Sequence, residues 1–256
     1  MLATAPASGP WTPSFGPWTI LAAPAEPFGV EIHGLHGEQP APADYLHDVL
    51  LAPAHREAML AWIDRVGLVV CLDVRTAHPS YQDVRGRSSR GRLSQGEYYH
   101  HDGCSGPTKP RVVEIRCPHQ AIERRVATAV APFPDTVYAM LRALPASIAG
   151  LPEIAGHRAR LSDDGGLPRE TWDTVQGVVT RAVRRELDAE SARAYFRDVD
   201  AVVRAYRAPW RMGESRLIAN ANPGVTMQHR RAYLEPHEGG RPSGHLVKRW
   251  PAEVLE

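Results

Sequence analysis

The sequence predicts a mixed, β-rich fold built as a single domain over residues 1–256. Three observations predict it. Strand-like segments lie toward both ends of the chain, helical spacing of apolar residues dominates the middle, and strands do not alternate with helices as in a βαβ fold. A length of 256 residues suits one domain carrying an insertion, and it is enough to bury a substantial core.

The composition is that of an ordinary globular protein, with 43% hydrophobic and 23% charged residues. A formal net charge of +1 provides no field that would attract nucleic acid or an anionic membrane. Residues 1–25 are rich in Pro, Ala and Gly, without a basic start or a continuous apolar stretch, so we expect an N-terminal extension rather than a secretory signal. No later segment is long enough to cross a bilayer. We therefore expect a cytoplasmic protein without nucleic-acid or membrane partners.

The first half of the chain predicts three strands and a helix. Residues 29–35 alternate between apolar and polar side chains, as a half-buried strand does. Residues 53–66 place apolar side chains at helical spacing, and Gly67 ends that helix. Apolar, β-branched residues predict two further strands, over 69–74 and 111–117.

The rest of the chain adds a loop, more helices and the closing strands. Residues 75–96 are rich in Gly, Arg and Ser and have no period, which predicts a mobile loop and a candidate lid. Apolar spacing predicts one helix over 137–144 and two amphipathic helices over 168–206, which we interpret as an insertion beside a sheet. The last predicted strands cover 216–221, 225–233 and 245–250.

A His-x-Asp triplet is the first feature that could carry chemistry. If the chain around it is extended, His100 and Asp102 point to the same face of a strand, because side chains alternate. An imidazole and a carboxylate so placed can take two adjacent positions on one metal ion, and a further imidazole completes a facial triad for ferrous iron. An isolated His-x-Asp is more often a hydrogen-bonding pair on the surface. His101 faces the other way, which favours a packing role.

A second histidine lies far downstream, within the alternating segment 226–231. His229 near a strand end suits a metal ligand, with His237 and His245 as its rivals. Arg249 on the closing strand suits a carboxylate, because its planar guanidinium donates two parallel hydrogen bonds. The alternative interpretation is a solvated basic rim formed by Arg230, Arg231, Arg241 and Arg249.

Several segments, in order along the chain, resemble the Fe(II)/2-oxoglutarate-dependent dioxygenases of the taurine dioxygenase and clavaminate synthase group. The resemblance spans nearly the whole chain. Each segment is a weak signal alone, and their shared order makes the set fairly specific. They are Gly29–Leu35, Val66–Leu72, Tyr99–Gly103, Trp210–Glu214, His229–Pro236 and His245–Trp250. The resemblance implies a double-stranded β-helix (jelly roll) core with flanking helices and the helical insertion.

The resemblance also implies the metal ligands. His100, Asp102 and His229 match the family's iron ligands residue by residue. One departure from the family pattern lies just before the distal histidine. An Asp-Asn pair is often found there, whereas this chain has Gly224 and Val225 near that place.

The resemblance implies a binding site for 2-oxoglutarate, and here it leaves alternatives open. The family holds the distal carboxylate with an arginine on or just before the closing strand, where Arg249 and Arg241 both qualify. An alignment on His245 would instead place Gly244 and Lys248 at the family's arginines. Thr128 resembles the threonine that often assists the same carboxylate, although the two glycines that precede it in many members are absent.

The function implied by the resemblance is oxidation of a small molecule with Fe(II), 2-oxoglutarate and dioxygen. Related halogenases replace the carboxylate ligand with a small residue, so the presence of Asp102 favours hydroxylation, or a related desaturation or ring closure. By analogy of fold, the substrate is an amino acid, a carrier-bound amino acid or another product of specialised metabolism. Tyr99, Glu114 and Arg116 are candidates for lining the pocket, with surface or packing roles as the alternative.

Two other classes of function stay open at this point. The same ligands could hold zinc and activate a water in a hydrolase. The chain could also be a jelly-roll binding protein with a degenerate site, which the missing Asp-Asn pair permits. Metal content after anaerobic reconstitution, together with dependence on 2-oxoglutarate, separates the oxygenase from the zinc hydrolase. Failure to bind 2-oxoglutarate at all would favour the binding protein.

Overall fold

Two β-sheets and seven helices make up the part of the chain that the structure describes. The computed structural model describes residues 13–75, 82–84, 98–102, 110–116, 126–162, 171–221, 225–233 and 245–250. The larger sheet has seven strands in the order β1-β2-β3-β7-β5-β9-β4, in which β2 and β3 run parallel and the other neighbours antiparallel. The smaller sheet pairs β6 with β8 antiparallel.

The elements have the following bounds. The strands are β1 (Thr19–Pro24), β2 (Val30–His36), β3 (Leu68–Cys71), β4 (Gln82–Val84), β5 (Val112–Arg116), β6 (Val126–Pro132), β7 (Ser215–Ala219), β8 (Met227–Tyr233) and β9 (His245–Trp250). The helices are η1 (Leu46–Leu50), α1 (Arg56–Val66), α3 (Phe133–Arg142), α4 (Ala146–Ala149), α5 (Pro152–Ser162), α6 (Trp172–Glu186) and α7 (Ala189–Val202). None of these helices is long and apolar enough to cross a membrane.

The mixed fold class predicted from the sequence is confirmed. The strand expected over 29–35 is β2, and the helix expected over 53–66 is α1. Gly67 ends α1 with a φ of 82°, a left-handed conformation that favours glycine. The two helices expected within 168–206 are α6 and α7. In the described part of the chain the strands form two separate sheets rather than one closed barrel.

The segment expected to be an irregular loop contains a short strand. Residues Gln82–Val84 form β4, which pairs antiparallel with β9 so that Val84 lies opposite His245. Backbone hydrogen bonds to the edge of the sheet stabilise these three residues, and three residues are too few to show an apolar period. Residues 76–81 and 85–96 of the predicted lid lie outside the described residues.

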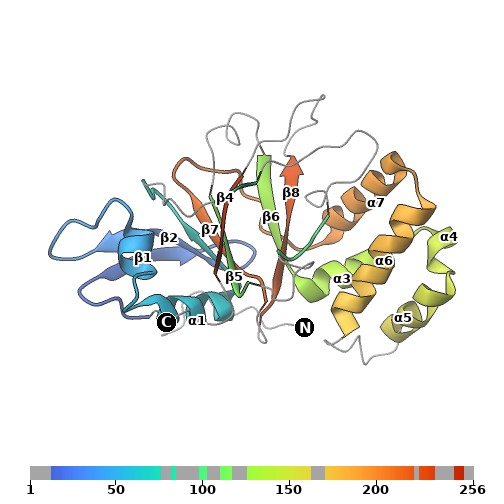
Figure 1. Cartoon of the computed structure of the whole chain (residues 1–256), viewed down its shortest axis with the longest axis horizontal. Coiled ribbons are helices and arrows are strands. Elements are labelled where there is room, and N and C mark those ends of the chain that lie inside the picture. The colour runs from blue at the N-terminus through green and yellow to red at the C-terminus, as the bar shows by residue number, and fades with distance from the viewer. Residues whose placement is uncertain are drawn as a thin grey trace.

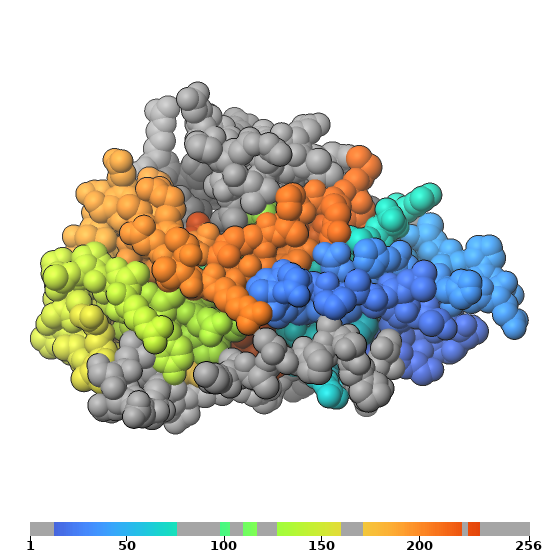
Figure 2. Space-filling view, turned by 180° about the vertical axis from the view of Figure 1, so that it is seen from behind, coloured from blue at the N-terminus to red at the C-terminus, as the bar shows by residue number. Residues whose placement is uncertain are grey.

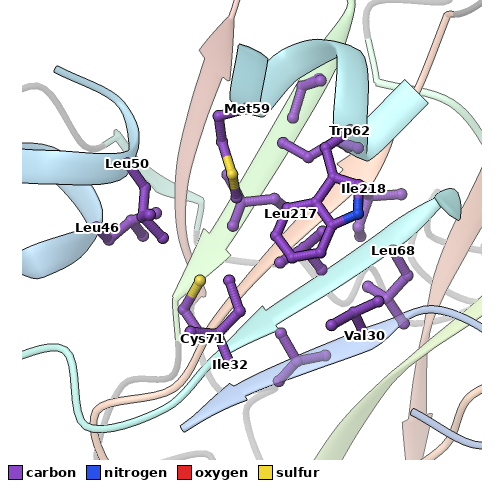
Figure 3. Packing of buried hydrophobic residues seen from close by; sticks show 14 of the residues in the cluster. Val30, Ile32, Leu46, Leu50, Met59, Trp62, Leu68, Cys71, Leu217 and Ile218 are labelled. Carbon is purple, nitrogen blue, oxygen red and sulfur yellow. The ribbon is translucent and has the colours of Figure 1, made fainter. Parts of the chain in front are cut away.

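One face of the larger sheet is covered by η1 and α1. Figure 3 shows Met59 and Trp62 of α1 packed over Leu217 of β7, with Leu46 and Leu50 of η1 beside them. The same buried cluster includes Val30, Ile32, Leu68 and Cys71 of the neighbouring strands. Burial of these apolar side chains holds η1 and α1 against the larger sheet.

The smaller sheet has its own helical cover. Figure 1 shows α3, α4, α5, α6 and α7 grouped beside β6 and β8, on the side away from β1 and β2. Ala127, Ala129 and Ala131 of β6 belong to the buried cluster that these helices form. Their short side chains allow the helices to approach the strand closely. The helical segment is therefore packed directly against the strand pair that carries His229.

The two sheets lie face to face, as the alternating side chains of β7 and β6 show. Leu217 of β7 packs beneath α1, whereas its neighbour Arg216 points the other way and donates from Nη1 to the Thr128 carbonyl of β6 at 2.6 Å. In β6, Ala129 packs with the helices while Val130 joins the cluster of the larger sheet. The smaller sheet thus has an outer face toward the helices and an inner face toward the larger sheet.

The connection from α7 to β7 ties the two halves together. In the view from behind, the orange chain that follows α7 runs between the helical group and the blue N-terminal strands (Figure 2). Tyr206 in this connection pairs with Val130 through backbone hydrogen bonds in both directions. Further along, Arg211 donates two hydrogen bonds to the Glu31 carboxylate of β2, at 2.8 and 3.1 Å.

Candidate metal centre

His100, Asp102 and His229 come together at one point of the structure. One ligand atom from each lies within 4.8 Å of the other two. The Asp102 Oδ1 atom is 3.8 Å from His100 Nε2 and 3.6 Å from His229 Nε2. Their side chains are 12%, 11% and 9% exposed for His100, Asp102 and His229, so the donor atoms are largely withdrawn from water. Two imidazoles and one carboxylate are the donor set of a facial triad.

Backbone pairing brings the two histidines together. His100 and His229 form an antiparallel bridge, with N–H to carbonyl hydrogen bonds of 3.1 Å in both directions. Directly opposed residues of antiparallel strands present their side chains to the same face, and here the ring centroids are 4.5 Å apart. Asp102 follows two residues after His100 and reaches the same side, as strand alternation predicts.

The orientation of His100 suits a metal ligand. Its Nδ1 lies 3.0 Å from the Tyr98 carbonyl oxygen. A proton on Nδ1 makes that hydrogen bond and leaves the Nε2 lone pair directed toward Asp102 and His229. Histidine ligands in metalloproteins are commonly held in this way, with one ring nitrogen donating to a carbonyl and the other binding the metal.

A hydrogen-bonded network lies behind the cluster, on the outer face of the smaller sheet. His101 is buried there against the ring of Phe133, and its Nδ1 lies 3.3 Å from Gln228 Nε2. Gln176 of α6 pairs with Gln228 and donates to the Tyr99 carbonyl at 2.9 Å. Tyr99 and Gln228 directly precede His100 and His229, so α6 is hydrogen-bonded to both segments that carry a histidine of the cluster.

Asn220 is a residue of this site that sequence reasoning missed. It directly follows β7, is fully buried, and hydrogen-bonds the backbone of Asp102. The sequence resemblance indicated that the Asp-Asn pair is missing, with Gly224 and Val225 near its place, further along the chain than Asn220. An asparagine directly after the apolar run Leu217–Ala219 was the signal that the sequence offered.

Thr128 lies on the same face of the smaller sheet as His229. In the β6–β8 register Val130 is opposite His229 and Thr128 is two residues away, which returns to the same face. Thr128 is 2% exposed, and no hydrogen-bond partner for its Oγ1 atom exists among the described residues. Its hydroxyl is therefore available for a ligand held between the two sheets.

The structure gives register positions for part of the basic closing segment. Arg249 is opposite Val113 and Lys248 is opposite Glu114 in the β5–β9 pairing. His245 begins β9 opposite Val84. Three other positions named from the sequence, Arg241, Gly244 and His237, lie outside the described residues.

The three residues predicted to line a pocket are not brought to the cluster. Tyr99 donates from its hydroxyl to Asp200 of α7 at 2.6 Å. Glu114 and Arg116 share the face of β5 that lies toward η1. Glu114 Oε2 is 3.2 Å from His47 Nε2, and Arg116 donates to the Val74 carbonyl at 2.8 Å. A pocket role for these three stays a prediction that their described contacts do not support.

The contacts of His47 predict that the free energy of unfolding depends on pH. Burial lowers the pKa of His47, but hydrogen bonds to Asp44 and Glu114 outweigh burial and raise it to about 9. Since the folded pKa exceeds the unfolded value, the stabilisation is complete below about pH 6.5 and is lost as pH rises through 9. We expect the free energy of unfolding to fall by up to about 3 kcal/mol over this range.

Urea unfolding of the wild type at several pH values measures this slope. The variant His47→Gln is expected to flatten it, whereas His33→Gln, which removes a half-exposed histidine of β2, should keep it. An unchanged slope in His47→Gln would show that the His47 pair does not contribute.

Comparisons with known proteins give matches among solved structures alone. No family model matches the chain. No curated protein matches it either. A taurine dioxygenase from Burkholderia xenovorans matches at 13% identity and a TM-score of 0.43, over 92% of each chain. PvcB, described as an Fe, alpha-ketoglutarate dependent oxygenase from an isonitrile synthetic pathway, matches at 13% identity and 0.39, over 95% of this chain and 94% of that one. AAD-2 in complex with Mn(II) and N-oxalylglycine matches at 13% and 0.43, over 93% of this chain and all of that one.

The names of the first two of these structures are those of the enzyme class that the sequence segments resemble. With all three TM-scores below 0.5, the function proposed below depends on this chain's own residues.

Proposed function

We propose that this protein is a non-haem Fe(II)/2-oxoglutarate-dependent oxygenase and that His100, Asp102 and His229 hold its iron. The observation that carries the proposal is the His-Asp-His cluster, with its three donor atoms within 4.8 Å of one another. Nitrogen and oxygen donors of this kind suit ferrous iron, and a triad on one face leaves positions open for a co-substrate and dioxygen. When bound, the iron supplies oxygen activation coupled to oxidative decarboxylation of 2-oxoglutarate.

The residues around the cluster have separate tasks in this proposal. The Tyr98 carbonyl keeps a proton on Nδ1 of His100 and so keeps Nε2 available as a ligand. Asp102 supplies negative charge in a site from which water is largely withdrawn, where its attraction for a cation is strong. The inner face of the smaller sheet and the opposed face of the larger sheet enclose the reacting groups, as in a jelly-roll core.

We place the distal carboxylate of 2-oxoglutarate between Arg249 and Thr128. The register supports Arg249 over Lys248. Lys248 lies directly opposite Glu114 in the β5–β9 pairing, and Glu114 faces η1. Arg249 lies directly opposite Val113, and Val113 is on the other face of β5 from Glu114. The Thr128 hydroxyl, which has no partner among the described residues, adds one donor. Arg241 stays the alternative arginine.

The variant Arg249→Ala is expected to raise the KM for 2-oxoglutarate about 10- to 100-fold, because a hydrogen bond to a charged group contributes about 1.5–3 kcal/mol. Steady-state kinetics with 2-oxoglutarate as the varied substrate measure this. Lys248→Ala is the matched control and should leave the KM near the wild-type value. An increase in Arg241→Ala with none in Arg249→Ala would assign the role to Arg241.

The reaction we propose is hydroxylation of a small molecule, because Asp102 occupies the position that a halide would need. An amino acid or amino-acid-derived compound of specialised metabolism, free or bound to a carrier, is the substrate class we test first. A screen for succinate release with iron, 2-oxoglutarate and such compounds identifies it.

Anaerobic reconstitution of the apo-protein tests the proposal as a whole. We expect one Fe(II) per chain and consumption of 2-oxoglutarate on admission of oxygen. Retention of Zn(II) with no turnover of 2-oxoglutarate would indicate a zinc hydrolase. Failure to bind 2-oxoglutarate at all would indicate a non-catalytic binding protein.

A further inference from the structure

The side chain of Asn220 hydrogen-bonds both backbone polar groups of Asp102. Its N–H donates to Asn220 Oδ1 at 2.9 Å, and its carbonyl accepts from Asn220 Nδ2 at 3.1 Å. The same Nδ2 atom donates to the Pro110 carbonyl at 2.8 Å. Asn220 is fully buried, so these hydrogen bonds do not compete with water.

Asn220 itself is fixed in the larger sheet. It directly follows β7, its backbone N–H donates to the Arg111 carbonyl at 2.9 Å, and the preceding Ala219 pairs with Val112 of β5. The two histidines of the cluster are paired with each other beside β6 instead. The cluster therefore draws its imidazoles from the smaller sheet, whereas the turn that carries its carboxylate is anchored to the larger sheet by Asn220.

The chemistry of a primary amide matches this task. An asparagine side chain has two N–H donors and one carbonyl acceptor. Here the nitrogen reaches the two carbonyls of Asp102 and Pro110, and the oxygen accepts from the Asp102 N–H. A leucine has the same branching without these groups, and a serine is too short to bridge both backbone atoms of Asp102.

We propose that Asn220 is a positioning residue that sets the Asp102 carboxylate at the distance and angle needed for metal binding. This inference rests on the proposed metal centre, since it concerns how that centre is assembled. Removal of the hydrogen-bond partners that orient a metal ligand commonly costs 10–100-fold in metal affinity. Asn220 acts on the ligand through the backbone rather than through the carboxylate.

Titration of apo-protein with Co(II) tests the inference without turnover. We expect Asn220→Leu to raise the Kd for Co(II) about 10- to 100-fold and to shift the visible Co(II) spectrum toward that of Asp102→Ala. Tyr45→Phe is the matched control, since it removes a hydroxyl of a buried side chain that lies 2.7 Å from the Leu72 carbonyl and 3.4 Å from the Ile32 carbonyl. It should lower the thermal stability of the apo-protein and leave the Kd and the spectrum unchanged.

The outcomes separate the inference from the proposed function. A wild-type Kd and spectrum in Asn220→Leu would overturn the positioning role and leave the metal centre standing. If the wild type binds no Co(II), or if Asp102→Ala binds it as the wild type does, the metal centre and this inference both fail. Should Asn220→Leu not fold, Asn220→Ser is used, with the same expected direction and the same opposing outcome.

Discussion

Replacing Asp102 by alanine is expected to abolish succinate formation and to weaken Fe(II) binding by more than about 100-fold. Loss of a residue that merely orients a ligand costs 10–100-fold, and loss of a ligand itself costs more. Asp102 Oδ1 lies within 4 Å of both histidine Nε2 atoms. Among the described residues, Asp102 is the only carboxylate of this cluster. The remaining imidazoles would present two neutral donors.

Two measurements check this expectation. Metal content after anaerobic reconstitution reports on binding, and release of succinate reports on turnover. Asp48→Ala is the control, because it removes an exposed carboxylate from η1, across the larger sheet from the cluster. It should retain both. Full succinate formation in Asp102→Ala would remove Asp102 from the proposed iron ligands.

The largest effect on stability is expected at Arg216. This arginine and Glu214 are both fully buried, and Arg216 Nε lies 2.5 Å from Glu214 Oε1. Arg216 also donates to the carbonyls of Thr128 and Ala208, and its guanidinium lies 3.9 Å from the ring centroid of Trp210. It thus connects β7, β6 and the chain that follows α7.

The variant Arg216→Met is expected to lower the free energy of unfolding by about 3–5 kcal/mol, because it leaves the Glu214 carboxylate buried without its closest partner. Urea unfolding measures this. Glu214→Gln in the same chain removes the buried charge, so the double variant should be less destabilised than the sum of the two single variants.

An exposed ion pair provides the contrast. Arg185 of α6 pairs with Glu153 and Glu186 on the surface, where water screens the interaction. Arg185→Ala should leave the urea midpoint near that of the wild type. A midpoint for Arg216→Met as high as that of Arg185→Ala would mean that the buried pair does not stabilise the fold.

Local pattern was sufficient for much of the fold. The helices α1, α6 and α7 and the strand β2 were predicted from apolar period, since a long amphipathic face is visible in the spacing of its residues. The strand β4 was missed because three residues are too few to show a period, and what defines the strand is its backbone pairing with the distant β9. The apolar pattern of a sequence therefore predicts helices and strands that bury one face. It does not predict a short strand that is defined by its pairing with the edge of a sheet.

The face of a strand on which a polar residue lies is a tertiary property. Glu114 and Arg116 are charged residues in an otherwise apolar strand, and both were predicted as candidates for lining the pocket. Register places them toward η1, where Glu114 meets His47, rather than toward the cluster. The sequence of β5 is compatible with either orientation, so only the packing of η1 and α1 on the sheet decides it.

The sequence by itself determined that His100 and Asp102 share a face if the chain there is extended. Side chains alternate along an extended chain, so residues two positions apart point the same way whatever the rest of the fold. The tertiary structure decided which distant side chains join them. Backbone pairing with β8 brings His229 alongside His100, and the end of β7 brings Asn220 to the backbone of Asp102. Such contacts depend on which strands become neighbours, a choice made by burial of apolar faces across the whole chain and not determined at any one position.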